Sequence, residues 1–112
     1  MRVDRCQQAT QGEPVCPRFR RAAVLLGRRW TAEIIARLLA GPHRFREIRR
    51  GVPGLSDRLL SQRLKELEEE GLVVRHVDAS TRPVQVAYAL TERGRELVGA
   101  VDALHQWAHE WL

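Results

Sequence analysis

The sequence contains a single lysine, two cysteines and few aromatic residues among its 112 positions. No apolar run approaches the roughly 18 residues that a membrane-spanning helix needs. The first fifteen residues also lack the apolar segment of a secretory signal. We therefore expect a cytoplasmic protein, in a compartment where thiols are usually kept reduced.

The positive charge is carried by arginine and is concentrated in one half of the chain. Residues 1–50 contain twelve arginines and four acidic residues, whereas residues 51–112 contain seven basic and ten acidic residues. Such asymmetry is typical of a protein that binds an anionic partner, and a solvated arginine-rich surface is the alternative explanation.

Motifs for catalysis and metal binding are scarce. The sequence has no glycine-rich phosphate loop, no paired catalytic carboxylates and no nucleophile with an evident base, so we expect no enzyme and no cofactor. A zinc site could be drawn from His105, His109, Cys6 and Cys16. The ten-residue spacing of the cysteines is not a usual zinc pattern, and we predict no metal.

The length suits one domain, and the pattern divides it into an arm and a folded unit. Residues 1–15 show no periodicity and predict a mobile arm, followed by a domain over residues 16–112. Three short helices are predicted to start near Pro17, Thr31 and Phe45, with Thr31 as an N-cap, and to stop at glycines. These stops are Gly27, Gly41 and Gly51.

The stretch from Leu55 to Leu90 predicts a helix followed by a β-hairpin. Ser56 is a good N-cap, apolar residues recur at i, i+4 and i+7 over Leu60–Leu67, and Gly71 stops the helix. Two strands follow, over Val73–Val77 and Val84–Leu90, joined by a polar turn at residues 78–83. Thr91 is then expected to cap one last helix.

This order of elements predicts a mainly α fold with a small antiparallel β-hairpin wing, the winged helix-turn-helix. In that fold the helix after the short turn enters the major groove and reads bases with its N-terminal residues. Arg58 suits guanine O6 and N7, and Gln62 suits adenine N6 and N7. The predicted DNA-binding residues of this helix are Ser56, Asp57, Arg58, Ser61, Gln62 and Lys65.

The remaining polar residues of the helix and wing have other expected roles. Ser61 and Lys65 suit phosphate or mixed contacts. Asp57 is expected to support the cap or to orient Arg58, because phosphates repel a carboxylate. At the wing tip, Ser80, Thr81 and Arg82 are candidates for DNA contact, with Arg82 reaching the minor groove or a phosphate.

The last helix carries a seam of apolar residues. Spacings of four and three, as in a heptad repeat, connect them, and two tryptophans near the terminus are hard to bury in one small subunit. We expect an interface between two copies, with packing on the first helix as the alternative. The predicted interface residues are Leu97, Val101, Leu104, Trp107, Ala108 and Trp111.

Several motifs resemble the HxlR-type branch of the MarR-like winged-helix transcription regulators. They include Cys16-Pro17, Leu26-Gly27-Arg28-Arg29-Trp30, the run from Gly41 to Ile48, Leu64 to Val73, and Arg82-Pro83 through Gly94 to Trp107. The resemblance covers nearly all of residues 16–111. It implies a homodimer, joined through its first and last helices, that binds a palindromic operator, and it implies a backbone-anchoring role for Arg44. Leu26-Gly27 and Arg82-Pro83 replace the usual Gly-Gly and Pro-Pro of the family.

Cys16 is a candidate redox residue. It would lie at a helix N-terminus beside several arginines, and both the helix dipole and the cations favour the thiolate. The resemblance implies sensing of oxidants or electrophiles by an N-terminal cysteine. A disulfide would use Cys6, Cys16 of a second subunit or a small thiol, while an inert packed cysteine is the alternative.

The predicted function is a dimeric, sequence-specific DNA-binding regulator, with repression expected and an oxidant or small molecule as candidate effector. The alternative is a winged helix that docks on a protein or on RNA. Sequence-selective and steeply salt-dependent binding to duplex DNA separates the two.

Overall fold

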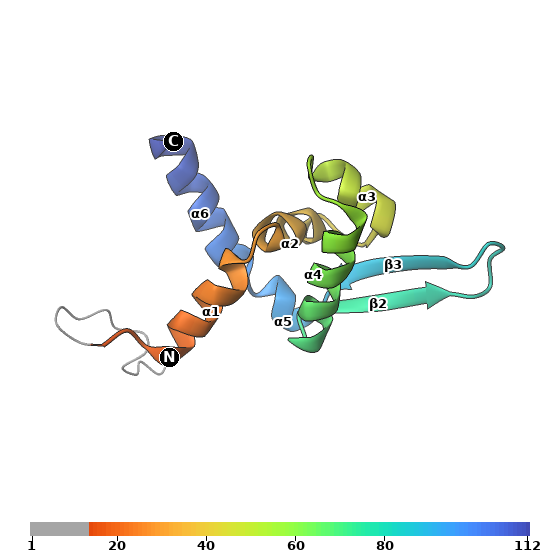
Figure 1. The fold of residues 1–112 in the computed structure, drawn as a ribbon, viewed down its shortest axis with the longest axis horizontal. Helices are drawn as coiled ribbons and strands as arrows, with labels where there is room; N and C mark the ends of the chain where they lie inside the picture. Colours follow the sequence, from red (N-terminus) through yellow and green to blue (C-terminus); the bar gives the residue numbers. More distant parts are fainter. Residues whose placement is uncertain (1–13) are drawn as a thin grey trace.

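The protein is described by a computed structural model that covers residues 14–112 (Figure 1). The predicted arm at residues 1–15 falls almost entirely outside these residues. Among the described residues, no helix is long and apolar enough to cross a membrane. The helices and strands in chain order are α1 Pro17–Gly27, α2 Thr31–Leu39, β1 His43–Arg44, α3 Phe45–Gly51, α4 Asp57–Glu69, β2 Val73–Asp78, β3 Gln85–Leu90, α5 Glu92–Arg95 and α6 Val98–Trp111.

The core lies where α2, α3 and α4 meet the base of the hairpin. Ile34 and Ile35 of α2, Ile48 of α3 and Leu60 of α4 are completely buried there. The predicted i, i+4, i+7 stripe of α4 is buried throughout. Burial of this stripe leaves the opposite, polar side of α4 in solvent, which confirms the predicted helix-turn-helix with its wing.

The helix ends follow the predicted caps with one exception. Ser56 caps α4, since its Oγ accepts a hydrogen bond from the Leu59 N–H at 3.2 Å. Gly71 stops that helix with a φ of +75°. The prediction that Thr31 caps α2 is wrong: Thr31 is the first helical residue and is buried, and Trp30 is the N-cap with a φ of 80°.

The sheet has three strands in the order β1-β3-β2, all antiparallel. The hairpin register pairs Val73 with Leu90 and Asp78 with Gln85. β1 was not predicted from the sequence and adds two residues, which pair with Tyr88 and Ala87 on β3. Beyond Val73, β2 is exposed, so the hairpin extends from the body as a free ribbon (Figure 1).

The predicted single last helix is in fact two helices, α5 and α6. Thr91 caps α5 as expected, because its Oγ1 accepts a hydrogen bond from the Gly94 N–H at 3.1 Å. A Cβ on Gly94 would lie 2.3 Å from the Leu72 carbonyl oxygen, so the chain passes very close to the start of the wing here. α1 and α6 then extend from the side of the body opposite the wing (Figure 1).

Candidate nucleic-acid interface

The exposed side of α4 carries the residues predicted to read DNA. Arg58, Ser61, Gln62 and Lys65 are all exposed, while the leucines on the other side of the helix are buried. Ser56 is exposed too, but its hydroxyl is engaged as the N-cap. The structure thus brings the predicted set together on one face of α4, and the residues of this set are open to solvent.

Asp57 bonds to α3, in addition to its place in the first turn of α4. Its Oδ1 lies 3.0 Å from Nη1 of Arg49 on α3, in an ion pair between the two helices of the helix-turn-helix. A carboxylate in the first turn of α4 also favours the helix dipole. Asp57 therefore fixes α3 against the start of α4 and is not paired with Arg58.

Three arginines on α3 were missed by the sequence analysis. Arg46, Arg49 and Arg50 are exposed on the short helix that precedes α4. Arginines on the first helix of the motif suit phosphate contacts, which position a protein on duplex DNA. The excess of arginine in residues 1–50 was the signal that could have identified them.

Arg44 is held at the edge of the sheet. Its Nη2 donates a hydrogen bond to Oε1 of Gln85 at 2.5 Å, and its backbone N–H donates to Oε1 of Glu47 at 2.7 Å. The backbone hydrogen bond from Arg44 lowers the pKa of the Glu47 carboxyl, and nearby positive side chains add to that effect. Arg44 is exposed beside the start of α3, where it suits an anchor on the DNA backbone.

The polar residues of the wing tip bond to one another. Ser80 donates its backbone N–H and its hydroxyl to Asp78 Oδ1, which lowers the pKa of the Asp78 carboxyl. Thr81 donates its hydroxyl to the Pro83 carbonyl at 3.0 Å. Arg82 donates from Nη1 to the Ala79 carbonyl at 2.8 Å, so its guanidinium folds over the tip. A DNA contact by Arg82 would share or exchange this bond.

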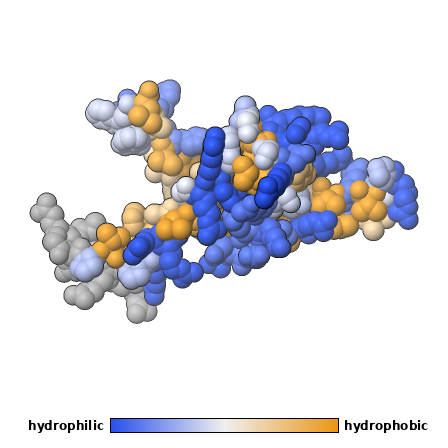
Figure 2. All heavy atoms as spheres, in the orientation of Figure 1, coloured by the Kyte–Doolittle hydropathy of each residue, from blue (hydrophilic) through white to orange (hydrophobic). Residues whose placement is uncertain are grey.

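The predicted interface residues of the last helix separate into two groups. Leu97 and Val101 pack on the core of this chain, and Ala108 is half-buried. Leu104, Trp107 and Trp111 are exposed by 60%, 54% and 70%. In Figure 2, apolar surface lies over α6 and α1, and further apolar patches lie at the middle of the molecule and on the wing.

Cys16 is the N-cap of α1 and precedes Pro17 at the first helical position, as predicted. Its sulfur is disulfide-bonded in the structure. Cys6, the other predicted redox residue, lies outside the described residues.

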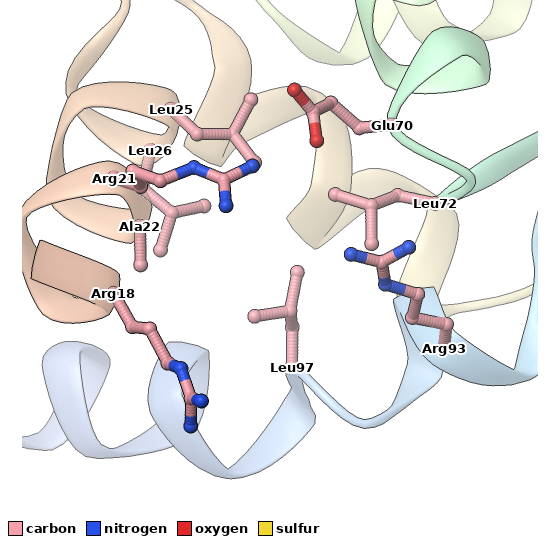
Figure 3. A pocket seen from close by; sticks show the side chains of 9 residues that line it. All are labelled: Arg18, Arg21, Ala22, Leu25, Leu26, Glu70, Leu72, Arg93 and Leu97. Atoms are coloured by element: carbon pink, nitrogen blue, oxygen red, sulfur yellow. The ribbon is translucent and has the colours of Figure 1, made fainter. Parts of the chain in front are cut away.

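A cavity of about 370 Å³ opens between α1 and the junction of α4, β2 and α5 (Figure 3). Its apolar lining comes from Leu25 and Leu26 of α1 together with Leu72 and Leu97. Charged groups surround these leucines: Arg18, Arg21, Glu70 and Arg93. Such a lining suits a small ligand with an apolar body and an anionic edge.

Comparisons with known proteins agree with this geometry. The model of the HxlR-like helix-turn-helix family matches residues 25–112. The helix-turn-helix transcriptional regulator YvaP of Bacillus subtilis, itself uncharacterised, is 47% identical over 98 residues, which cover 88% of this chain and 90% of YvaP. The transcriptional regulator YodB of the same organism is 42% identical over 100 residues, which cover 89% of this chain and 88% of YodB.

Solved structures show the same relationship. The reduced form of YodB is similar with a TM-score of 0.77 and 41% identity, over 88% of this chain and 95% of that structure. YodB has also been solved after diamide treatment and with bound quinone. The oxidised form of the redox regulator HypR is similar with a TM-score of 0.78 and 34% identity, over 85% of this chain and 96% of that structure.

Proposed function

The chain belongs to the HxlR-like helix-turn-helix family of transcriptional regulators, and on that basis we propose that it is a homodimeric repressor that binds a palindromic operator. It is a DNA-binding regulator and not an enzyme. One observation carries the proposal: the exposed face of α4, bearing Arg58, Ser61 and Gln62, follows directly on the basic helix α3. We propose that the protein acts in the cytoplasm, where it would bind DNA.

The charge distribution along α4 supports docking by its N-terminal half. Glu66, Glu68 and Glu69 gather toward the C-terminal end, where phosphates would repel them. The first two turns carry Arg58 and the polar Ser61 and Gln62, close to the arginines of α3. We propose that Arg58 and Gln62 read bases and that the α3 arginines, Arg44 and Lys65 hold phosphates.

The exposed apolar side chains of α6 support the homodimer. Leu104, Trp107 and Trp111 lie on a helix that projects from the body, and Phe19 and Val24 of α1 are exposed by 64% and 56%. Such a surface is costly in water and typical of a protein–protein interface. A second copy that packs α1 and α6 against their equivalents would cover it and place two α4 helices on successive major grooves, about 34–36 Å apart.

We further propose that oxidants or electrophiles regulate this dimer through Cys16. Cys16 is the N-cap of α1 and is disulfide-bonded in the structure, and the similar proteins YodB and HypR have been solved in oxidant-treated or oxidised forms. Reduction would break the disulfide of Cys16 and return two thiols, and oxidation would form the bond again, with two electrons passing from the thiols to the oxidant. Because α1 is also part of the proposed interface, this bond would alter the dimer.

The cavity of Figure 3 is where we place a small-molecule effector. Its leucines and guanidinium groups suit an aromatic carboxylate, for which benzoate is the simplest probe. Arg93→Ala is expected to weaken benzoate binding measured by calorimetry. Arg20→Ala, which removes an exposed arginine of α1 outside the cavity, is the matched control. If both variants bind benzoate equally well, the cavity is not the effector site.

Selection from a random duplex pool tests the proposed function. Reduced protein is expected to enrich an inverted repeat with half-sites about 10–10.5 base pairs apart, centre to centre. Addition of diamide is expected to lower binding to that repeat, and Cys16→Ser should abolish this response while binding normally when reduced. Enrichment of no sequence would instead favour the alternative, docking on a protein or on RNA.

A further inference from the structure

The C-terminal end of α1 is bonded to the middle of α4 by a small charged network. Arg28, the C-cap of α1, places Nη1 3.3 Å from Oε1 of Glu66. Nη1 of Arg63 on α4 lies 3.2 Å and 3.3 Å from the two carboxylate oxygens of the same glutamate. Nε of Arg63 also donates a hydrogen bond to the Arg29 carbonyl at 2.9 Å. Arg63 therefore connects α4, the helix that we propose reads DNA, directly to the turn that follows α1.

This network is more shielded from solvent than the other ion pair of α4. The side chains of Arg63 and Glu66 are exposed by 14% and 26% and that of Arg28 by 39%, whereas those of Arg49 and Asp57 are exposed by 49% and 68%. Partial burial reduces screening by solvent and salt, so the Arg63–Glu66 bond constrains geometry more strongly than a surface pair does. The guanidinium of Arg63 faces the α1–α2 turn and is not among the exposed groups that we propose contact DNA.

Trp30 fixes the same turn at a second point. It is the one non-glycine residue with a positive φ among the described residues, and its ring is half-buried against the core. A Cβ on Gly54, in the turn before α4, would lie 3.2 Å from Cη2 of Trp30, so the ring packs directly on that glycine. The α1–α2 turn thus contacts both the turn that precedes α4 and the middle of α4.

We propose that Arg63 is a positioning residue that sets the separation of the two recognition helices, and therefore the half-site spacing that the dimer prefers. This inference rests on the proposed homodimer. If α1 is part of the interface, the position of each α4 relative to the partner follows from its attachment to α1. Arg63, bonded to Glu66 and to the Arg29 carbonyl, makes this attachment from the side of α4, together with the Arg28–Glu66 pair. Base recognition by Arg58 and Gln62 is separate from it.

The chain offers a closely matched pair of variants for a test. Glu66→Gln removes the carboxylate that binds Arg28 and Arg63. Glu69→Gln makes the same change three residues later on the same helix, at an exposed position. Both variants lose one negative charge from α4, so a general gain in DNA affinity is common to the two. Arg63→Ala is a second variant that removes the network from its other side.

The experiment measures affinity for duplexes in which two half-sites are set at the selected spacing, or one base pair closer or farther apart, and for a duplex with a single half-site. Wild type and Glu69→Gln are expected to keep the same preference for the selected spacing. Glu66→Gln and Arg63→Ala should reduce that preference by about three- to tenfold, with binding to the single half-site retained.

Two outcomes would overturn the proposal in distinguishable ways. The spacing preference of Glu66→Gln and Arg63→Ala could be unchanged, or their affinity could fall equally on all duplexes, including the single half-site. Either result would mean that the network only stabilises α4 itself. A wild-type protein without any spacing preference would contradict the proposed dimer on an inverted repeat, and the role of Arg63 with it.

Discussion

Arg49 of α3 and Asp57 of α4 form an ion pair, with 3.0 Å between Nη1 and Oδ1, at the exposed start of α4. The pair holds the carboxylate of Asp57 near the point where the proposed DNA would approach. It also engages one of the arginines that would otherwise face phosphate. We propose that Asp57 trades some DNA affinity for a fixed angle between the two helices.

The substitution Asp57→Asn tests this trade. It should strengthen binding to a scrambled duplex, because Arg49 is released and a repulsive charge is lost. The free energy of unfolding should fall by less than about 1 kcal/mol, since both partners are well exposed to solvent. Fluorescence anisotropy and urea denaturation measure the two effects. Unchanged or weaker binding to the scrambled duplex would contradict this role of Asp57.

Arg58→Ala should lose sequence preference. If Arg58 pairs with a guanine, its removal costs about 1–3 kcal/mol on the selected operator and much less on a duplex with that base pair changed. Lys65→Ala is the comparison, because a phosphate contact should weaken binding on both duplexes alike. Equal losses on the two duplexes for Arg58→Ala would remove its base-reading role.

Arg82→Gln tests whether the wing contributes charge to DNA binding. The glutamine amide can still donate a hydrogen bond within the tip, where Arg82 now bonds the Ala79 carbonyl. Loss of the charge should weaken binding evenly across sequences and reduce the dependence of log K on log salt concentration by about 1. If the salt dependence stays the same, Arg82 serves only to fold the tip.

Gly94→Ala should destabilise the protein, because the added Cβ would lie 2.3 Å from the Leu72 carbonyl oxygen and force the backbone of α5 away from the wing. We expect a loss of about 1–3 kcal/mol in the free energy of unfolding. Gly99→Ala in α6 is the control, since nothing lies within 4 Å of its Cβ. Alanine there should be neutral or stabilising by up to about 1 kcal/mol. Equal stability of the two variants would contradict the close approach at Gly94.

Strong local signals made much of the fold predictable from the sequence. Ser56 at the N-cap, Gly71 at the stop and the buried leucine stripe define α4 through short-range geometry, and the structure confirms all three. The hairpin followed from β-branched residues on either side of a polar turn. These features depend on neighbours in sequence, which is why a pattern can identify them.

The errors have a common cause in contacts between distant parts of the chain. Threonine is a common N-cap residue, but tertiary packing buries Thr31 inside the helix. Trp30, in a left-handed conformation, is the N-cap instead. β1 is two residues long and exists only because β3 pairs with it. The break between α5 and α6 falls at Glu96 and Leu97, where the sequence has no glycine or proline to indicate it.

The candidate site was predicted in the same uneven way. The exposed face of α4 followed from helical periodicity, which places Arg58, Ser61 and Gln62 opposite the leucines. The partner of Asp57 and the bonds of Arg63 did not follow, because each connects α4 to another element. Side-chain partners across elements depend on the final packing, and a single sequence carries no direct record of them.

A titration of three duplexes tests the central claim most directly. Fluorescence anisotropy would follow reduced protein binding to the selected inverted repeat, to one half-site, and to a scrambled duplex of equal length. We predict two protomers per inverted repeat and an affinity at least about 10³-fold above that for the scrambled duplex at physiological salt. Equal affinity for all three duplexes would contradict a dimeric, sequence-specific DNA-binding regulator.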